Sequence, residues 1–215
     1  MRSKKYQELE NKEVNAEVAG EDVTTTKTEG NAQGSDSIME WVKGAAIAIV
    51  IAVAILQFIK PTVVQQHSME PNFHTNDYLF ISKQAYKLFR GTPQLGDVIV
   101  FATDMKTTEG ENKLLIKRVI GVPGDEISIY AGKVYVNGQE IDDSYTKDMT
   151  TPGDIDKLVV PSDTVFCLGD NRRISVDSRD ESVGLISYDS ILGKVIFRLL
   201  PMDKMGVIKN PYDED

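Results

Sequence analysis

The chain has 215 residues, of which 41% are hydrophobic and 27% charged, and its formal net charge is −9. This length and composition fit one sizeable folded domain with additional segments. The acidic balance argues against a nucleic-acid-binding protein, which would carry clustered Lys and Arg. The single cysteine, Cys167, excludes an internal disulfide, and its apolar neighbours predict a buried strand residue.

Residues 1–40 are predicted to form a disordered tail. They are rich in Glu, Lys, Thr, Asn and Gly and nearly free of large apolar side chains. Such a segment cannot bury enough apolar surface to offset the entropy of ordering. Its acidic content also differs from that of an Arg-rich transit peptide.

Residues 41–59 are predicted to form a transmembrane helix. Ala, Ile and Val dominate, and Gln57 is the only polar residue after Lys43. A helix of this length spans about 28 Å, close to the thickness of the hydrocarbon layer. Trp41, Lys43 and Lys60 lie at its edges, as interfacial residues do. A buried core helix is the alternative, and the start 40 residues into the chain argues against a cleaved signal peptide.

Residues 60–209 are predicted to form a mainly β domain, and 210–215 a frayed acidic terminus. Short apolar runs alternate with turn residues, and no βαβ pattern occurs. Two hairpins are indicated, with turns at Ala131-Gly132 and Asn137-Gly138, the second being a favoured type I′ dipeptide. Residues 142–160 are polar and irregular and predict an exposed excursion. The expected strands lie at 78–82, 98–101, 114–121, 127–130, 133–136, 139–141, 165–168, 184–186 and 194–197.

The sequence offers few groups for metal or phosphate chemistry. His67 and His74 are the only histidines, and with Cys167 they match no known ligand spacing. Glycine-rich phosphate-binding loops are absent. We therefore expect no metal and no cofactor. A histidine base for Ser68 is disfavoured, because neighbouring side chains of an extended segment point apart.

A serine with a lysine base is the remaining nucleophilic arrangement. Lysine acts as a base only when neutral, and burial among apolar groups lowers its pKa toward that state. Lys117 lies inside the apolar run Leu114 to Ile120, which indicates such a setting. An edge-strand lysine that points outward is the alternative interpretation. Further along, the polar segment 169–179 follows an apolar strand and supplies many hydrogen-bonding groups, although it also fits a solvated turn.

Five features in order resemble the bacterial type I signal peptidases, which are membrane-bound Ser–Lys proteases. After the apolar helix come Ser68-Met69-Glu70-Pro71 and Gly96-Asp97-Val98-Ile99-Val100-Phe101. Lys117-Arg118-Val119-Ile120-Gly121-Val122-Pro123-Gly124-Asp125 follows, and then Gly169-Asp170-Asn171-Arg172 with Ser175, Asp177, Ser178 and Arg179. The resemblance covers residues 41 to about 209. It implies an antiparallel β catalytic domain of the signal-peptidase type behind one transmembrane helix.

The resemblance also implies roles for individual residues. Ser68 would be the nucleophile, with its backbone N–H as an oxyanion donor, and Lys117 the general base. Ser175 would orient the Lys117 amine, and an ion pair between Asp177 and Arg179 would brace the loop.

Four further residues receive roles from the same motifs. Asp170 and Asn171 would support the loop, and Met69 and Pro71 would contact the substrate.

The sequence departs from the family pattern at three places. Ile174 stands where Asn is usual, and Asn72-Phe73 where Thr-Leu is usual. Gln66 stands two residues before the nucleophile, where relatives carry Gly or Ser, and in some of them that serine is a second oxyanion donor. The departure at Gln66 matters, since one oxyanion donor is worth about 2.7–4 kcal/mol.

The expected function is cleavage of signal peptides from exported preproteins after small residues of the Ala-x-Ala kind. The expected partners are these preproteins and the lipid bilayer, and the expected state is a monomer. A single-pass location in the cell membrane is expected, with the N-terminus cytoplasmic and the catalytic domain outside. A catalytically silent, membrane-tethered peptide-binding module is the alternative. A self-cleaving repressor-type protease is disfavoured by the apolar helix.

Overall fold

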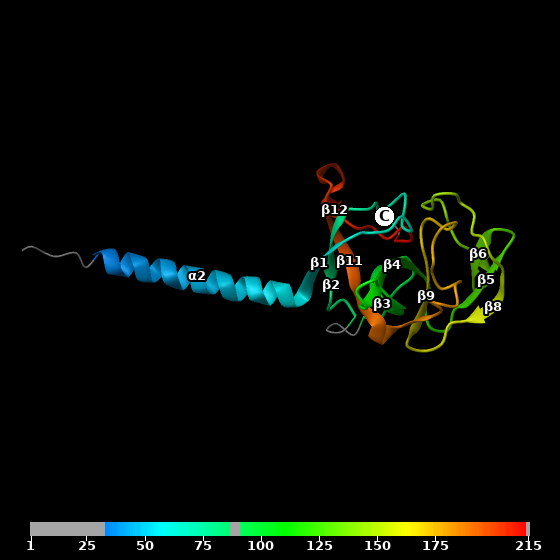
Figure 1. Ribbon diagram of the computed structural model, residues 1–215, viewed down its shortest axis with the longest axis horizontal. Coiled ribbons are helices and arrows are strands. Elements are labelled where there is room, and N and C mark those ends of the chain that lie inside the picture. The colour runs from blue at the N-terminus through cyan, green and yellow to red at the C-terminus, as the bar shows by residue number, and fades with distance from the viewer. Residues whose placement is uncertain (1–32, 87–90, 214–215) are drawn as a thin grey trace, which may run out of the picture. The chain divides into compact units, whose positions relative to one another are not determined.

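The computed structural model describes residues 33–86 and 91–213 (Figure 1). The expected tail over residues 1–32 lies outside the described residues, as do the last two residues of the acidic terminus. The chain divides into two units between Ile49 and Val50, and the second unit holds all the strands.

Helix α2 runs from Gln33 to Phe58. Its segment Ile38–Phe58 has 21 residues with a mean hydropathy of 2.1, and the protein buries none of the residues of this apolar stretch. Such a helix is long and apolar enough to cross a membrane. Residues 33–40 were expected in the tail but continue the helix, since no proline interrupts the backbone there. Ile59, expected in the helix, begins the first strand.

A large sheet forms the centre of the domain. Its strands follow the order β1-β2-β11-β3-β4-β9-β10, with β12 also paired to β11, and all pairs are antiparallel. The strands are β1 Ile59–Val63, β2 Tyr78–Ser82, β3 Val98–Lys106, β4 Asn112–Gly121, β9 Thr164–Leu168, β10 Ile186–Ser187, β11 Ile191–Leu200 and β12 Gly206–Val207. Two short 3₁₀ helices, η1 Tyr188–Ser190 and η2 Met202–Lys204, flank β11.

A four-stranded antiparallel sheet lies beside the large one in Figure 1, in the order β7-β6-β5-β8. Its strands are β5 Glu126–Tyr130, β6 Lys133–Val136, β7 Gln139–Glu140 and β8 Ile155–Val159. The two tight turns have positive φ at both central residues, 49° and 78° at Ala131-Gly132 and 54° and 78° at Asn137-Gly138. This geometry is that of type I′ turns, as the Asn-Gly dipeptide predicted.

Strand β4 connects three clusters of buried apolar side chains. Ile116 belongs to the cluster around Met69 and Phe73. Val119 belongs to a second cluster, and Ile120 to the third, which extends to the small sheet. Because β4 packs on both faces, polar side chains within it are removed from water.

The prediction of a mainly antiparallel β domain after one apolar helix is confirmed. The prediction of an exposed excursion over residues 142–160 holds for most of the segment but not for all of it. Asp143, Thr146 and Thr151 are buried, and β8 lies within this segment. Their polar groups are buried because they are paired, which composition alone does not reveal. Strand β1 was missed because its Pro61 suggests a break, although an edge strand tolerates proline.

Candidate active site

Ser68 lies on a loop that leaves β1 and returns to β2. Two backbone hydrogen bonds close the base of this loop, from Val64 N to Asp77 O at 3.0 Å and from Asn76 N to Val64 O at 2.8 Å. Within it, Phe73 N donates to Met69 O at 2.9 Å. Met69 and Phe73 are buried in the core, so their side chains anchor the loop to the domain. Ser68 itself is only 5% exposed.

Lys117 points from the centre of β4 toward this serine. Its Nζ donates to Ser68 Oγ at 2.7 Å and to Ile116 O at 3.1 Å, and the residue is fully buried. Because Lys117 is fully buried and its amine bonds Ser68, the alternative of a lysine that points outward into solvent is excluded.

The surroundings of Lys117 change its acidity. Burial lowers the pKa of Lys117 to about 8, because the ammonium form loses hydration. The negative charges of Asp177 and Asp170 oppose part of this shift. An amine with this pKa is neutral in a substantial fraction of molecules at mildly alkaline pH.

The loop over residues 169–179 binds the backbone on either side of Ser68 through Asn171. Asn171 N donates to Ser68 O at 3.0 Å, and its Nδ2 donates to His67 O at 3.2 Å. Asn171 O accepts in turn from Ser175 N at 3.1 Å. One residue therefore fixes the serine segment and the following turn relative to each other.

Gly169 lies where the loop and the serine segment approach most closely. A Cβ at this position would lie 2.2 Å from Ser175 Oγ and 2.5 Å from Ser68 O. Ser175 Oγ is buried and has no hydrogen-bond partner among the described residues, so it is not bonded to Lys117. The structure brings Ser175 into the site but does not show the orienting hydrogen bond that the resemblance implies.

Asp177 and Arg179 form the ion pair that the sequence suggests. Arg179 Nε donates to Asp177 Oδ1 at 2.8 Å, and Asp177 is fully buried. Asp177 Oδ2 accepts from Gly169 N at 3.0 Å. This bond links the ion pair to the point where the loop lies closest to the serine segment. The guanidinium also donates to Arg172 O at 2.7 Å, so both ends of the loop are held.

Two buried arginines also form ion pairs around the site. Sequence analysis gave neither of them a role. Arg118 donates to both carboxylate oxygens of Asp170, at 2.9 and 2.7 Å. Arg172 donates to both oxygens of Asp143, at 2.9 and 2.7 Å. The sequence signal for Arg118 was its place next to Lys117 in an apolar strand. Asp143 offered no signal, because it lies in the segment expected to be exposed.

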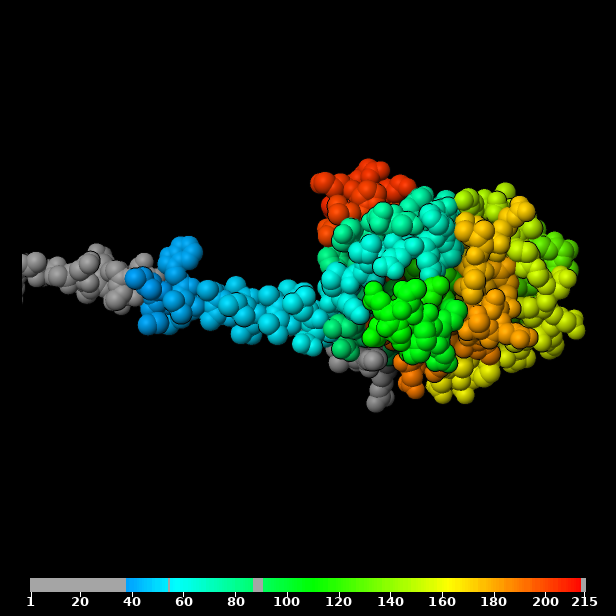
Figure 2. All heavy atoms as spheres, viewed as in Figure 1, coloured from blue at the N-terminus to red at the C-terminus, as the bar shows by residue number. Residues whose placement is uncertain are grey.

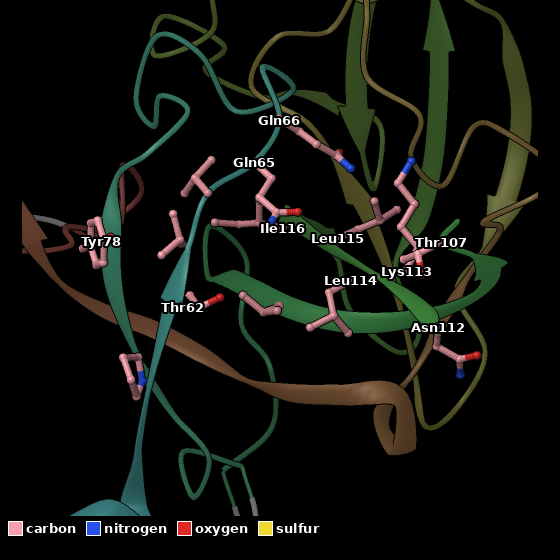
Figure 3. A pocket seen from close by; sticks show the side chains of 14 residues that line it. Thr62, Gln65, Gln66, Tyr78, Thr107, Asn112, Lys113, Leu114, Leu115 and Ile116 are labelled. Carbon is pink, nitrogen blue, oxygen red and sulfur yellow. The ribbon is translucent and has the colours of Figure 1, made fainter. Parts of the chain in front are cut away.

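A pocket of about 610 Å³ lies between the segment that follows β1 and the first half of β4 (Figure 3). In Figure 2 the cyan-to-teal surface that includes residues 61–66 adjoins the bright green surface of residues near 110. Gln66 and Lys113 extend toward the same end of the pocket (Figure 3). The lining residues are Pro61, Thr62, Val63, Val64, Gln65, Gln66, Tyr78, Val100, Thr107, Asn112, Lys113, Leu114, Leu115 and Ile116.

Both sides of this pocket are strand edges. In the part of the chain that the structure describes, β1 pairs only with β2. Strand β9 pairs with β4 from Arg118 onward, so among the described residues Leu114 to Ile116 line the pocket along an edge that β9 does not cover. An extended peptide can add to such edges through its backbone.

Two residues expected to contact the substrate do not line this pocket. Met69 is fully buried in the core, and Pro71 lines a different pocket. The reason is the tight turn after Ser68, which directs successive side chains to different sides. Ile174 is 58% exposed, and its backbone N donates to Asn171 O at 3.3 Å.

Metal binding finds no support among the described residues, since no three His, Cys, Asp or Glu side chains cluster there.

Comparison with known proteins places the chain among signal peptidases. The sequence model of the family described as "Signal peptidase, peptidase S26" matches residues 38–200. Signal peptidase I P of Bacillus subtilis subsp. natto is 34% identical over 183 residues, which cover 80% of this chain and 94% of that protein. Probable signal peptidase I-2 of Synechocystis sp. is 32% identical over 180 residues, covering 82% and 80%.

A crystal structure of a signal peptidase I from Enterococcus faecalis V583 is also similar, at 27% identity and a TM-score of 0.39. The match covers 48% of this chain and 97% of that chain. Because the family match and the relatives extend over most of the sequence, the chain belongs to the signal peptidase I family, peptidase S26.

Proposed function

We propose that Ser68 and Lys117 are the catalytic dyad with which this signal peptidase I removes signal peptides from preproteins. The observation that carries the proposal is the 2.7 Å contact between Lys117 Nζ and Ser68 Oγ in a buried setting. A nucleophile and a base within hydrogen-bond distance are the minimal arrangement for acyl transfer.

In the first step, the neutral Lys117 amine takes the Ser68 hydroxyl proton while Oγ bonds to the scissile carbonyl carbon. The carbonyl electron pair moves to oxygen, and in this proposal the Ser68 backbone N–H donates to the oxyanion. When the tetrahedral intermediate collapses, the C–N bond breaks. The Lys117 ammonium gives its proton to the leaving amine, and an ester on Ser68 remains.

In the second step, Lys117 takes a proton from water, whose oxygen bonds to the acyl carbon. Collapse of the second intermediate breaks the ester bond, and Lys117 returns its proton to Ser68 Oγ. The signal peptide leaves with a new carboxylate, and the dyad regains its starting protonation.

Asn171, Asp170, Asp177, Arg179 and Ser175 are supporting residues in this proposal. Asn171 holds the backbone around Ser68, and Asp170 binds Arg118 on the other face of β4. The pair of Asp177 and Arg179 fixes the loop that carries Ser175. We propose that Ser175, whose hydroxyl has no partner at rest, hydrogen-bonds Lys117 during the reaction.

The substrate would lie in the pocket between β1 and β4 as an added strand. Free strand edges supply backbone hydrogen bonds, and the apolar lining suits the small side chains that precede a signal-peptide cleavage site. The preproteins reach this site from the membrane, and we propose that the enzyme acts as a monomer.

One N-terminal apolar helix and family membership indicate membrane anchoring. We propose that the residues before the apolar segment Ile38–Phe58 lie in the cytoplasm and that this segment spans the bilayer. Residues 60–209 would then form the peptidase domain outside the cytoplasm, and 210–215 a tail. Protease added to intact spheroplasts should degrade the domain and leave the N-terminal part protected. Protection of the domain instead would reverse the topology.

The dyad is tested by Ser68→Ala and Lys117→Met in the full chain. Each should lower cleavage of an Ala-x-Ala precursor by at least about 10³-fold, because the residual rate then rests on binding and the oxyanion site. Lys157→Met, a change of an exposed lysine in β8, is the control and should cleave normally. Normal processing by either dyad variant would show that the nucleophile or base lies elsewhere.

A further inference from the structure

The pocket between β1 and β4 carries one charge. Among the described residues that line it, Lys113 alone is charged, and the others are apolar or uncharged polar residues. The pocket thus holds a cation without a carboxylate in its lining, although the formal net charge of the whole chain is −9. A charge in a largely apolar pocket acts on a ligand more strongly than one in open water, because the surroundings screen it less.

The donors of Lys113 and Gln66 are available to a ligand. Both residues are half-buried, and their side chains extend from opposite sides toward the same end of the pocket (Figure 3). Lys113 takes part in none of the ion pairs formed by the described residues. Within this part of the chain, neither the Lys113 amine nor the Gln66 amide makes a hydrogen bond. An ammonium and an amide NH₂ on two sides of a groove suit a carboxylate, which only accepts hydrogen bonds.

The backbone of Lys113 is held in place by a side chain of the neighbouring strand. The regular pairing of β3 with β4 is interrupted between Ala102 and Lys106, next to Lys113. At this interruption the Thr103 hydroxyl donates to Lys113 O at 2.9 Å, and Thr103 is only 8% exposed. The lysine side chain therefore starts from a fixed point of the pocket wall, although it lies at an irregular part of the sheet.

Lys113 lies on the same face of β4 as the base of the dyad. It precedes Lys117 by four residues, and side chains an even number of residues apart share a face of a strand. At about 3.3 Å per residue, the two backbone positions lie about 13 Å apart. Burial is the main cause of the low pKa of Lys117, and the positive charge of Lys113 lowers this pKa further. The two amines are thus within electrostatic reach of each other.

The direction of the two pocket walls sets the register of a bound signal peptide. Residues 61–66 lead along the chain to Ser68, and residues 112–116 lead to Lys117. A peptide whose scissile carbonyl lies at Ser68 fills the pocket with the residues that precede the cleaved bond. If the residue just before that bond lies opposite Lys117, the residue opposite Lys113 is four positions earlier, the fifth before the bond. Its side chain shares a face with the first and third residues.

We propose that Lys113 is a specificity-determining residue that selects signal peptides with a carboxylate at the fifth residue before the cleaved bond. The Lys113 ammonium pairs with this carboxylate, and the Gln66 amide donates a second hydrogen bond to it. The inference deepens the proposed function and rests on it, since the bound peptide must be the substrate of the dyad.

The test compares two Ala-x-Ala precursors that differ only at this fifth residue, which is Glu in one and Lys in the other. The full chain in micelles of a neutral detergent should cleave the Glu precursor with a kcat/KM about fivefold higher at low ionic strength, the size expected for a partly exposed ion pair. Lys113→Glu should reverse this preference, because attraction and repulsion change places. The control Lys157→Glu makes the same change of charge on an exposed lysine of β8 and should keep the wild-type preference.

Two further measurements separate a charge effect from a change of shape. About 0.5 M salt should reduce the preference of the wild type, because it screens an ion pair but not a steric contact. Moving the Glu to the fourth residue before the bond should abolish the preference, because that side chain points to the opposite face.

The outcomes distinguish failure of this inference from failure of the proposed function. Equal cleavage of the Glu and Lys precursors by the wild type would overturn the role of Lys113 and leave the dyad intact. The same conclusion would follow if Lys113→Glu kept the wild-type preference, or if Glu at the fourth residue served as well as Glu at the fifth. Failure of the wild type to cleave any precursor would overturn the proposed function itself, and the inference with it.

Discussion

The dyad consists of two side chains that the fold removes from water for different reasons. Ser68 is covered because its neighbours Met69 and Phe73 are core residues. Lys117 is covered because both neighbouring strands pack against β4. Burial of the amine costs stability and at the same time lowers its pKa, so the same packing that penalises the fold creates the base.

The activity should rise with pH through the pKa of Lys117. Burial places this pKa at about 8, so about a tenth of the molecules carry the neutral amine at pH 7. The rate constant kcat/KM for a substrate without groups that titrate near pH 8 should therefore increase about tenfold between pH 7 and pH 9. A flat profile, or one that falls over this range, would exclude Lys117 as the base.

Lys117→Met should make the inactive protein more stable. The pKa of Lys117 in the folded protein, about 8, lies below the ordinary value of 10.5. Below pH 8 the burial of the charged amine therefore lowers the free energy of unfolding by its full amount, about 3 kcal/mol. Because the variant also loses the hydrogen bonds of the amine, we expect its free energy of unfolding to exceed that of the wild type by about 1–3 kcal/mol at pH 7, or its Tm by several degrees.

The sign of this effect can be checked by repeating the unfolding measurement at higher pH. Between pH 8 and 10.5 the unfolded wild-type chain holds one more proton at Lys117 than the folded chain does, so wild-type stability rises with pH. The advantage of Lys117→Met should accordingly shrink at pH 10. A variant that is less stable than the wild type at pH 7 would mean that packing around Lys117 outweighs its desolvation.

At the level of elements, the segment 142–160 is tied to the catalytic loop through Arg172. This arginine is 1% exposed and bonds Asp143, the Thr151 hydroxyl and Gly169 O. Lys147 also pairs with Glu70 at 2.9 Å, beside the nucleophile. The segment therefore braces the site, although its composition resembles a solvated loop.

Removing one partner of the buried Arg172–Asp143 pair should cost about 3–5 kcal/mol of unfolding free energy, since it leaves the other charge unpaired. The double variant Arg172→Met/Asp143→Leu should cost less than the sum of the two single changes. The exposed pair Lys133–Glu140, at 2.9 Å, is the matched control, and its loss should cost under about 1 kcal/mol. Similar costs for both pairs in denaturant unfolding would contradict the bracing role.

Some of these elements can be predicted from the sequence and others cannot, for physical reasons. Hairpin turns such as Asn137-Gly138 are local, so the dipeptide alone identifies them. The Ser68–Lys117 contact joins residues far apart in the chain, and it was reached through the family motif rather than through local pattern. The buried pair of Arg172 and Asp143 was missed because polar residues satisfied by distant partners look the same in sequence as solvated ones.

On the scale of the whole molecule, the helix and the peptidase domain are independent in their packing. All three apolar clusters draw only on residues from Val64 onward. None of the residues in the apolar stretch of Ile38–Phe58 is buried within the protein. This separation explains why the fold class was predictable: an apolar helix and alternating strands each carry their own signal.

A variant lacking residues 1–58 should therefore fold and unfold cooperatively on its own. It should cleave a short soluble peptide about as fast as the full chain does, but a membrane-bound preprotein about 10²-fold or more slowly, because the shared membrane no longer concentrates enzyme and substrate. Circular dichroism and the two cleavage assays measure this. Loss of cooperative unfolding would mean that the helix contributes to the core.

The alternation of side chains along β4 has a consequence for the gene. Lys117 faces Ser68, and the next residue, Arg118, faces Asp170 on the opposite side of the strand. The Lys codons AAA and AAG differ by a single nucleotide from the Arg codons AGA and AGG, yet the two positions need different cations. An arginine beside Ser68 would stay protonated and could not act as a base. A lysine beside Asp170 lacks the planar guanidinium that donates to both carboxylate oxygens. Two adjacent codons for chemically similar cations are thus separately constrained, and mutational exchange between them should yield inactive enzyme in either direction.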